Sequence, residues 1–367
     1  MPEGTNSEIR GIRHIAVRGY KSIKSLDLPL GALNVLIGAN GAGKSNFISV
    51  FRLLNELSEQ NLQGFVARSG GANALLHYGR KTTKEIHIKL DSSKIGYETY
   101  LDPDAHDGFN FRKEAAIVYV EGDDLSPYRT FLGTGQRESL LPLVDPLTSS
   151  NVINMLNSLK IYHFHDTSPS ASMKQTGDIN DNATLRADAS NLAAFLYRFQ
   201  KNNEIYYRKI IDTIGLVAPF FRDFNLRADP LNPEKIRLEW RERASDAYFN
   251  AHALSDGTLR FICLATLLLQ PDPPATILID EPELGLHPSA IQTLVELFRL
   301  ASEKSQLIVS TQSVSLVNQL TPEEIIVVDR AEDQSLFRRL QSNEITTWLE
   351  DYALGDLWEK NVIGGRP

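Results

Sequence analysis

The sequence predicts an α/β fold, in which a core of alternating strands and helices carries a layer of antiparallel strands and a helical insertion. A short apolar run at 33–37 ends in a glycine-rich turn, and apolar residues at helical spacing follow it. A second apolar run at 276–279 ends in two acids, and a third lies at 306–310. Residues 85–120 contain runs that alternate between apolar and polar side chains, which is typical of antiparallel hairpins.

We divide the chain into four parts. Residues 1–160 contain the glycine-rich turn and the antiparallel strands, and residues 161–250 contain a lid loop rich in Ser, Thr, Asn and Asp and the helical insertion. Residues 251–345 form a second compact half, and residues 346–367 form a tail. Within these parts, apolar spacing predicts strands at 12–17, 33–37, 275–279 and 306–310, helices at 191–199 and 206–214, and helices that begin near Lys44, Thr258 and Pro288.

Length and composition fit a globular chain with a sizeable core, since 42% of the 367 residues are hydrophobic and 23% are charged. The net charge of −8 makes the whole molecule a poor binder of polyanions, so a nucleic-acid role would need a local basic patch or a partner. The single cysteine, Cys263, excludes an intrachain disulfide, and its apolar neighbours indicate a buried thiol. No signal peptide is visible and the apolar stretch 261–269 is too short to cross a bilayer, so we expect a cytoplasmic protein without a membrane association.

The turn Gly38-Ala39-Asn40-Gly41-Ala42-Gly43-Lys44-Ser45, called the phosphate loop below, matches the pattern G-x-x-x-x-G-K-[ST] in full. Its glycines let backbone N–H groups turn toward a phosphate, and the following helix adds the positive end of its dipole. Lys44 would bridge the β- and γ-phosphates of ATP, and the Ser45 hydroxyl would ligate Mg²⁺. The alternative is a glycine-rich turn that matches by chance, which the flanking strand and helix disfavour. The predicted nucleotide contacts are Gly38, Asn40, Gly41, Ala42, Gly43, Lys44, Ser45 and Asn46.

The strand at 276–279 ends in Asp280-Glu281-Pro282. Asp280 would hold Mg²⁺ through its water shell, and Glu281 would orient and polarise the attacking water. Adjacent strand residues face opposite ways, but the chain bends at a strand end, so both acids can reach the phosphates. The alternative is a turn that caps the helix beginning near Pro288. The presence of the phosphate loop favours the catalytic interpretation.

Leu254-Ser255-Asp256-Gly257-Thr258, called the signature turn below, precedes a helix and resembles the L-S-G-G-Q signature of ABC-type ATPases, with departures at Asp256 and Thr258. The phosphate loop, the signature turn and the strand-end acids occur in the order found in that class. The resemblance implies a P-loop ABC-type ATPase head, in which the signature of one subunit caps the ATP held by the other, and hence a homodimer formed through ATP. Ser255, Asp256 and Gly257 are then nucleotide contacts, in a turn where Ser255 offers a hydroxyl, Gly257 offers a backbone N–H and the helix from Thr258 adds its positive end. The alternative is an ordinary helix-capping turn.

Three further segments resemble the same class. Arg18-Gly19-Tyr20-Lys21-Ser22-Ile23 is similar to the N-F-[RK]-S element of RecF, SMC and related ATPases, which makes Lys21 and Ser22 candidate nucleotide contacts. Glu283-Leu284-Gly285-Leu286-His287-Pro288 resembles the loop that follows the acids. Gln312 stands where transporter-type ABC proteins carry a switch His, as in RecF-like and overcoming-lysogenization-defect (OLD)-like ATPases. Because its amide can hydrogen-bond but cannot titrate, we expect slow turnover and a sensor role, with Glu281, Gln312 and Lys44 as the catalytic residues.

Features that the sequence lacks distinguish it from two subgroups of this class, the SMC heads and the OLD nucleases. No heptad run interrupts it as the coiled coil interrupts SMC heads, and too few residues follow Leu320 for the Toprim module of OLD nucleases. Val120-Glu121-Gly122-Asp123-Asp124 mimics a Toprim fragment, but its place among hairpin strands indicates a turn. Nearly the whole chain resembles the stand-alone ATPases of the OLD/RecF-like group, which implies a separate effector protein, commonly a nuclease, in bacterial defence against phage. The resemblance includes the closing Trp348-Leu349-Glu350, Gly355-Asp356-Leu357-Trp358 and Gly364-Gly365-Arg366-Pro367.

Two weaker features leave alternatives open. His163 and His165 could ligate a metal, but no further cluster of ligands supports this, and a strand that leads into the lid loop near the nucleotide fits better. The basic residues of the middle segment form either a solvated helical surface or, as the sharper hypothesis, a DNA groove. These residues are Arg186, Arg198, Lys201, Arg208, Lys209, Arg222 and Arg227.

We therefore expect an ATPase that binds and slowly hydrolyses Mg-ATP, dimerises through it, and gates a partner effector or a DNA transaction in phage defence or DNA repair. The alternative is a non-catalytic ATP sensor that holds a toxin or nuclease inactive.

Overall fold

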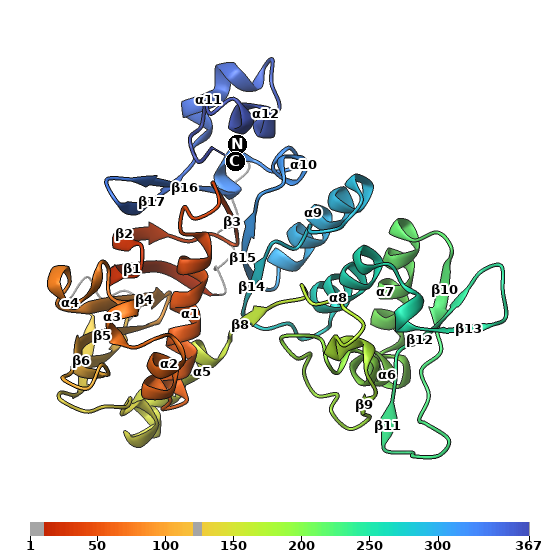
Figure 1. The fold of residues 1–367 in the computed structure, drawn as a ribbon, viewed down its shortest axis with the longest axis horizontal. Coiled ribbons are helices and arrows are strands. Elements are labelled where there is room, and N and C mark those ends of the chain that lie inside the picture. The colour runs from red at the N-terminus through yellow and green to blue at the C-terminus, as the bar shows by residue number, and fades with distance from the viewer. Residues whose placement is uncertain (1–10, 120–126, 367) are drawn as a thin grey trace.

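The computed structural model describes residues 11–119 and 127–366, with two large β-sheets and helices around them (Figure 1). The central sheet has the strand order β17-β16-β3-β15-β14-β8, in which all neighbours are parallel except β17, which pairs antiparallel with β16. β15 therefore lies between the strand that leads into the phosphate loop and the strand that ends in the two acids. The strands are β3 (Leu33–Ile37), β8 (Leu159–Tyr162), β14 (Thr276–Asp280), β15 (Gln306–Thr311), β16 (Ile325–Ala331) and β17 (Gln334–Arg339).

Both faces of the central sheet are covered by packed residues. Successive side chains of each strand point to opposite sides, so each strand contributes to two cores. Leu36 and Leu278 belong to the core that surrounds α1 (Lys44–Ser58). Val35 and Ile277 belong to the core on the other face, which is built by α8 (Asp256–Leu269) and α9 (Pro288–Ser302). Burial on both faces explains why these strands have continuous apolar runs in the sequence.

The second sheet is antiparallel and packs its apolar side chains into the same core as α1. The hairpins predicted within residues 85–120 are confirmed, and the strand predicted at 12–17 is longer and pairs with strands on both sides. No strand was expected at 23–29, where charged and polar residues weaken the apolar signal. In spatial order the strands are β2 (Ile23–Pro29), β1 (Ile12–Tyr20), β4 (Ile86–Ser92), β5 (Ile95–Pro103), β6 (Phe109–Val118) and β7 (Tyr128–Gly133). The fragment Val120-Glu121-Gly122-Asp123-Asp124 lies outside the described residues.

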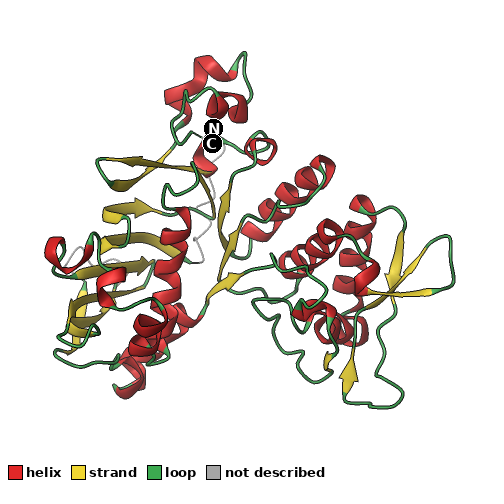
Figure 2. Ribbon diagram, viewed as in Figure 1, coloured by secondary structure: helices red, strands yellow, loops and turns green. Residues whose placement is uncertain are grey.

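The chain between β8 and β14 leaves the central sheet and carries α6 (Leu192–Asn202) and α7 (Glu204–Val217), which confirm the two helices predicted there. It also contains short strands that the sequence did not predict, because strands of 2 to 4 residues carry no readable alternation. Figure 2 shows this mixture of helices and short strands set apart from the two large sheets. The short strands are β9 (Gly177–Asp178), β10 (Phe221–Phe224), β11 (Lys235–Ile236), β12 (Glu239–Glu242) and β13 (Tyr248–Asn250).

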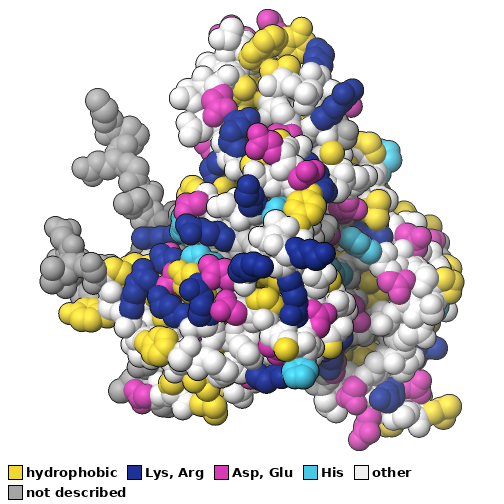
Figure 3. Space-filling model, turned by 60° about the vertical axis from the view of Figure 1, so that its left-hand side comes forward, with side chains coloured by type: hydrophobic (Ala, Val, Ile, Leu, Met, Phe, Trp, Pro, Cys, Tyr) yellow, Lys and Arg dark blue, Asp and Glu magenta, His cyan; other side chains and the backbone are white. Residues whose placement is uncertain are grey.

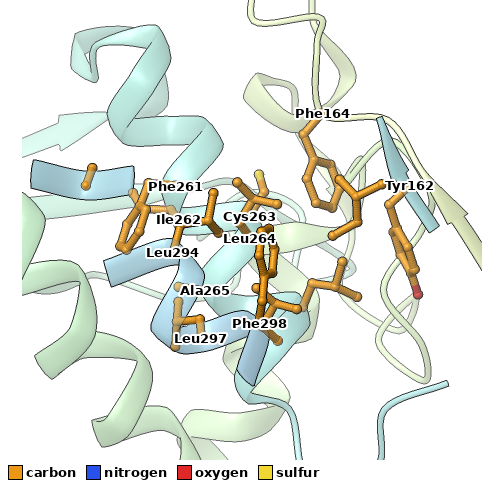
Figure 4. Close-up of a cluster of buried hydrophobic side chains, with 14 of the residues drawn as sticks. Tyr162, Phe164, Phe261, Ile262, Cys263, Leu264, Ala265, Leu294, Leu297 and Phe298 are labelled. Atoms are coloured by element: carbon orange, nitrogen blue, oxygen red, sulfur yellow. The ribbon is translucent and has the colours of Figure 1, made fainter. Parts of the chain in front are cut away.

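From Leu259 onward α8 is buried on all sides, which explains its continuous apolar sequence. Residues 261–265 are all buried, although successive positions point in different directions (Figure 4). Phe298 of α9 packs into the same cluster. The predicted burial of Cys263 is confirmed, and this burial raises the pKa of its thiol.

The remaining elements are short. The helices are α2 (Leu62–Arg68), α3 (Ala72–Leu75), α4 (Gly79–Thr82), α5 (Pro146–Asn157), α10 (Val314–Val317), α11 (Ser342–Leu349) and α12 (Leu354–Glu359). Single 3₁₀ turns lie at Leu141–Leu143, Ser172–Lys174, Ala251–Ala253 and Pro322–Glu324. None of the helices in the described ranges is both long enough and apolar enough to cross a membrane.

Candidate nucleotide site

The phosphate loop connects β3 to α1, as predicted, and two of its glycines are required for different reasons. Gly43 has a φ of 123°, and a Cβ at this position would lie 2.1 Å from Oγ of Ser335. Gly41 has a φ of 77° and no atom within 4 Å of the place its Cβ would take, so its backbone faces open space. The loop is therefore packed tightly on one side and open on the side where a phosphate would enter.

A cavity of about 150 Å³ lies on the open side of the loop. Two residues from other strands complete its wall, Glu281 after β14 and Gln312 after β15. The structure thus brings these two predicted catalytic residues to the phosphate loop, across long separations in the sequence. The loop residues that line the cavity are Ala39, Asn40, Gly41, Gly43, Lys44, Ser45 and Asn46.

Lys44 is buried and its side chain is folded onto its own loop. Its Nζ donates to the backbone oxygens of Gly38 at 2.5 Å and Ala39 at 3.1 Å. Burial lowers the pKa of the ammonium, and the nearby carboxylates of Glu281, Asp280 and Glu283 act in the opposite direction. To reach a bound phosphate, Lys44 would exchange the two carbonyl oxygens for phosphate oxygens.

The two strand-end acids take different positions, since Glu281 lines the cavity, whereas Asp280, the predicted Mg²⁺ ligand, is not among its lining residues. Glu281 has a φ of 43°, in the left-handed region that non-glycine residues seldom adopt. Asp280 accepts a hydrogen bond from the Ser310 hydroxyl on the neighbouring strand, and Glu281 accepts one from the Gln312 amide. The backbone N–H of Glu281 donates to the Ser310 oxygen at 2.9 Å, which holds the bend. Strain of this kind is common at functional sites.

Glu283 is a site residue that the sequence analysis placed only in the following loop. It is buried, and its Oε1 accepts from the Thr311 hydroxyl at 2.6 Å and from the Gln312 backbone N–H at 3.1 Å. Its other oxygen is buried without a hydrogen-bond partner in the structure, and burial raises the pKa of the carboxyl group. Glu283 therefore fixes the backbone that carries Gln312. A third acid directly after Asp-Glu-Pro was the signal available in the sequence.

Lys21 and Ser22 lie behind the phosphate loop and α1, and neither lines the cavity. Lys21 donates to the Ser49 hydroxyl on α1 at 3.3 Å, and the Ser22 hydroxyl accepts from Asn46 at 2.8 Å. Ser335 of β17, which is fully buried, lies 2.7 Å from the same hydroxyl and donates to the backbone oxygen of Ala42 at 2.5 Å. These contacts support the loop from behind. Sequence reasoning missed Ser335 because it comes from a strand far along the chain.

The signature turn caps α8, so the helix-capping interpretation holds within one protomer. The Ser255 hydroxyl accepts from the Thr258 backbone N–H at 3.2 Å, and Asp256 pairs with Lys174 at 3.5 Å. A Cβ on Gly257 would lie 2.2 Å from the backbone oxygen of Gly285, so the turn rests against the loop that follows the acids. None of the residues 254–258 lines the cavity of the same protomer. Their contact with a nucleotide held by a second copy stays a prediction.

His163 and His165 continue from β8 toward the acids. Nε2 of His165 lies 2.7 Å from the backbone oxygen of Asp280, and Nε2 of His163 lies 2.7 Å from a guanidinium nitrogen of Arg52 on α1. Burial lowers the pKa of His163. Across residues 11–119 and 127–366 no group of three or more His, Cys, Asp or Glu side chains is arranged to hold a metal. The hypothesis of a histidine metal site therefore has no support, whereas the prediction of a strand leading past the site agrees with these contacts.

The basic residues of the middle segment are in part paired with acids. Four of them, Arg186, Arg208, Arg222 and Arg227, form ion pairs with neighbouring acids. Figure 3 shows Lys and Arg side chains gathered on the side of the antiparallel sheet that comes forward in this view, with Asp and Glu side chains among them. The exposed ion pairs of the middle segment agree with the interpretation of a solvated surface there.

Solved structures show the same fold. The SMC head bound to the C-terminal winged-helix domain of ScpA has a TM-score of 0.61 and 17% identity, over 92% of this chain and 99% of that one. The SMC head of Pyrococcus furiosus, with an extended coiled coil and bound to the C-terminal domain of ScpA, has a TM-score of 0.58, 16% identity and coverages of 93% and 99%. That of Pyrococcus yayanosii, with a coiled coil and joint, has a TM-score of 0.54, 14% identity and the same coverages of 93% and 99%. At this identity the likeness concerns the fold alone, and it confirms the α/β P-loop ATPase head.

Sequence comparisons agree with that assignment. The phosphate import ATP-binding protein PstB of Mycoplasma pneumoniae is 28% identical over 116 residues, which are 30% of this chain and 34% of the relative. The match thus spans about a third of that curated relative. The match of residues 33–318 to the family model described as "AAA domain, putative AbiEii toxin, Type IV TA system" covers well over half of the chain, which therefore belongs to this family of AAA domains.

Proposed function

We propose that this chain binds Mg-ATP in the cavity beside the phosphate loop, hydrolyses it slowly, and does so between two copies of itself. The observation that carries the proposal is the composition of one cavity wall, where the phosphate loop meets Glu281 and Gln312 from two other strands. A glycine-rich turn that matched the pattern by chance would not be expected to meet a carboxylate and an amide at the ends of adjacent parallel strands.

The donors present fit both the nucleotide and the metal. The open backbone at Gly41 and the N-terminus of α1 suit phosphate oxygens, and Lys44 adds a positive charge. The Ser45 hydroxyl and the Asp280 carboxylate are oxygen donors of the kind that Mg²⁺ prefers, Asp280 acting through water. Mg²⁺ bound with ATP would neutralise the charge that develops on the phosphate oxygens.

The attacking water would be handled by Glu281 and Gln312. The Glu281 carboxylate accepts the proton of the water as it attacks, and the Gln312 amide holds that carboxylate in place through the hydrogen bond already present. Glu283 keeps Gln312 in position through the backbone contact described above. Because Gln312 cannot take up or release a proton, we expect turnover to be slow.

The second copy would supply the signature turn. Ser255 and Asp256 are exposed and lie outside the cavity of their own protomer. The Ser255 hydroxyl accepts from the Thr258 N–H and would donate its own proton to a γ-phosphate held by another protomer, toward which the N-terminus of α8 would add its positive end. We propose that this ATP-dependent closure gates a separate effector, such as a nuclease or a toxin, in phage defence. The stand-alone OLD/RecF-like subgroup and DNA repair are narrower versions of the same proposal.

A non-catalytic ATP sensor is the second candidate, and a specific observation favours it. Lys44 is bonded to its own loop and Glu281 to Gln312, so the two groups that would act on the γ-phosphate and the water are already engaged. A sensor would use the binding energy of ATP to release these contacts and change shape, without a need for turnover.

One experiment separates the two candidates. ATP binding, phosphate release and mass in solution are measured for the wild type, Glu281→Gln and Lys44→Ala, each with Mg-ATP. The catalytic proposal predicts turnover in the wild type, a loss of about 10²- to 10⁴-fold with a trapped dimer in Glu281→Gln, and no nucleotide response in Lys44→Ala. Binding without turnover in the wild type would leave the sensor. A wild type that binds no ATP would refute both.

A direct role on DNA has its own test. Binding of the wild type to duplex DNA would have to weaken steeply as salt rises, and would have to be lost when the unpaired middle-segment cations are reversed in charge. Binding that is independent of those residues would contradict the groove hypothesis.

A further inference from the structure

Residues 354–366, called the tail segment here, contact the chain next to two parts of the candidate nucleotide site, the start of the phosphate loop and the helix that follows Gln312. They include Gly355-Asp356-Leu357-Trp358 and Gly364-Gly365-Arg366, which the proposed function leaves unused. The segment starts with α12 and ends beside the phosphate loop, although the loop lies far away in the sequence.

The first contact lies directly behind the phosphate loop. The backbone N–H of Gly365 donates to Oδ1 of Asp329 at 2.7 Å, just beyond the part of β16 that pairs with β3. A Cβ on Gly365 would lie 3.4 Å from the backbone oxygen of Ile37 and 3.5 Å from Cα of Gly38. The tail segment therefore lies against the last residue of β3 and the first glycine of the loop.

The second contact lies on the side of Gln312. The backbone N–H of Gly355 donates to the Asn318 side chain at 2.6 Å, and a Cβ on Gly355 would lie 2.6 Å from the backbone oxygen of Val314. Val314 begins α10, two residues after Gln312. The start of α12 therefore rests on the helix that follows the sensor residue.

The two contacts are joined by packed structure. Trp358 is fully buried between them, and its indole N–H donates to the backbone oxygen of Gly365. Ile363 is buried as well, and its backbone oxygen accepts from Arg338 of β17 at 3.0 Å. A displacement at one end would be transmitted to the other, because close-packed side chains cannot absorb it.

We propose that the tail segment is a strap that sets the position of the phosphate loop relative to Gln312, with Gly355, Trp358 and Gly365 as positioning residues. The consequence for nucleotide binding rests on the proposed function, whereas the mechanical coupling does not. Because coupling between two sites is reciprocal, loosening the strap loosens the loop, and a ligand that orders the loop orders the strap.

The test compares two alanine substitutions by hydrogen exchange. Gly365→Ala adds a methyl group against Val327 and the phosphate loop. Its matched control is Gly135→Ala, since Gly135 also has a positive φ, 80° against 62°, but nothing within 4 Å of its Cβ position. Without any nucleotide, we expect backbone amides of the phosphate loop to exchange about 2- to 30-fold faster in Gly365→Ala than in the control.

A second pair of variants tests the strap even if Gly365→Ala fails to fold. Asp329→Ala removes only the acceptor for the Gly365 N–H and should speed exchange at the phosphate loop, whereas Asp329→Asn keeps an acceptor oxygen and should restore the wild-type rate. In the wild type, Mg-ATPγS should slow exchange at residues 364–365, and in Gly365→Ala its affinity should fall about 2- to 30-fold.

If the phosphate-loop amides exchanged at equal rates in Gly365→Ala, Asp329→Ala and the control without nucleotide, the strap would be refuted. This outcome does not depend on whether the protein binds a nucleotide. A wild type that ignores Mg-ATPγS would instead overturn the proposed function, because the exchange without nucleotide still reports on the strap.

Discussion

Substitution of Gly257 by alanine would test the contact between the signature turn and the loop that follows the two acids. The added methyl group would lie 2.2 Å from the backbone oxygen of Gly285 and 3.1 Å from its carbonyl carbon. Both partners are backbone atoms, so no side chain can move aside. The gap would have to open by about 1 Å before the contact becomes an ordinary one.

The magnitude follows from two opposing effects. Overpacking of this kind costs about 1–3 kcal/mol, and the higher helix propensity of alanine returns up to about 1 kcal/mol. We therefore expect Gly257→Ala to lower the free energy of unfolding by up to about 2 kcal/mol, which for a chain of 367 residues corresponds to a fall in Tm of up to about 3 °C. The displacement would also reach Glu283, two residues before Gly285, and through it the backbone of Gln312.

The assay is urea unfolding of the wild type, Gly257→Ala and the matched control Gly215→Ala. Gly215 lies in the last turn of α7, and its added Cβ would meet only the end of the flexible Arg243 side chain, at 3.4 Å. The control keeps the propensity effect without the clash, so it should gain about 0.5–1 kcal/mol. If Gly257→Ala were stabilised as much as the control, the reasoning about the Gly285 contact would be refuted.

Three further predictions concern buried groups. The raised pKa of Glu283 means that the folded protein keeps a proton which the unfolded chain releases, so this residue makes stability fall as pH rises from the ordinary carboxyl pKa toward the raised one. Glu283→Gln should lack this loss, and parallel Tm-against-pH curves for the variant and the wild type would contradict the explanation. Ser335→Ala should lower the free energy of unfolding by about 1–3 kcal/mol, because the Ala42 oxygen and the Ser22 hydroxyl lose a buried partner. Its control, Ser25→Ala on the exposed side of β2, should be neutral. Equal urea midpoints for the two variants would contradict the support that Ser335 gives to the phosphate loop. Burial should keep Cys263 unreactive toward iodoacetamide at pH 8 until the protein unfolds, and stoichiometric labelling of the native protein within minutes would show that the thiol is accessible.

Local patterns sufficed for the elements that carry their own signal. The phosphate loop is specified by glycine spacing between a strand and a helix. α1 and α9 begin where they were expected, and α8 begins two residues before its expected start near Thr258. The hairpins of the antiparallel sheet follow from the period of two. Where the signal was short or mixed, as in β2 and the two- to four-residue strands between β9 and β13, the sequence was insufficient, because tertiary contacts rather than alternation hold these strands in place.

The residue types of the candidate site were determined by the sequence, and their neighbours by the tertiary structure. The phosphate-loop pattern identified Lys44, the acids at a strand end identified Glu281, and the resemblance to ABC-type ATPases identified Gln312 after the next apolar strand. That β15 lies between β3 and β14, so that Gln312 meets Glu281, is decided by strand order in the folded sheet. The support behind the loop from Ser335 and Gly365 was likewise invisible, since such contacts join distant segments and depend on close packing rather than on any local period.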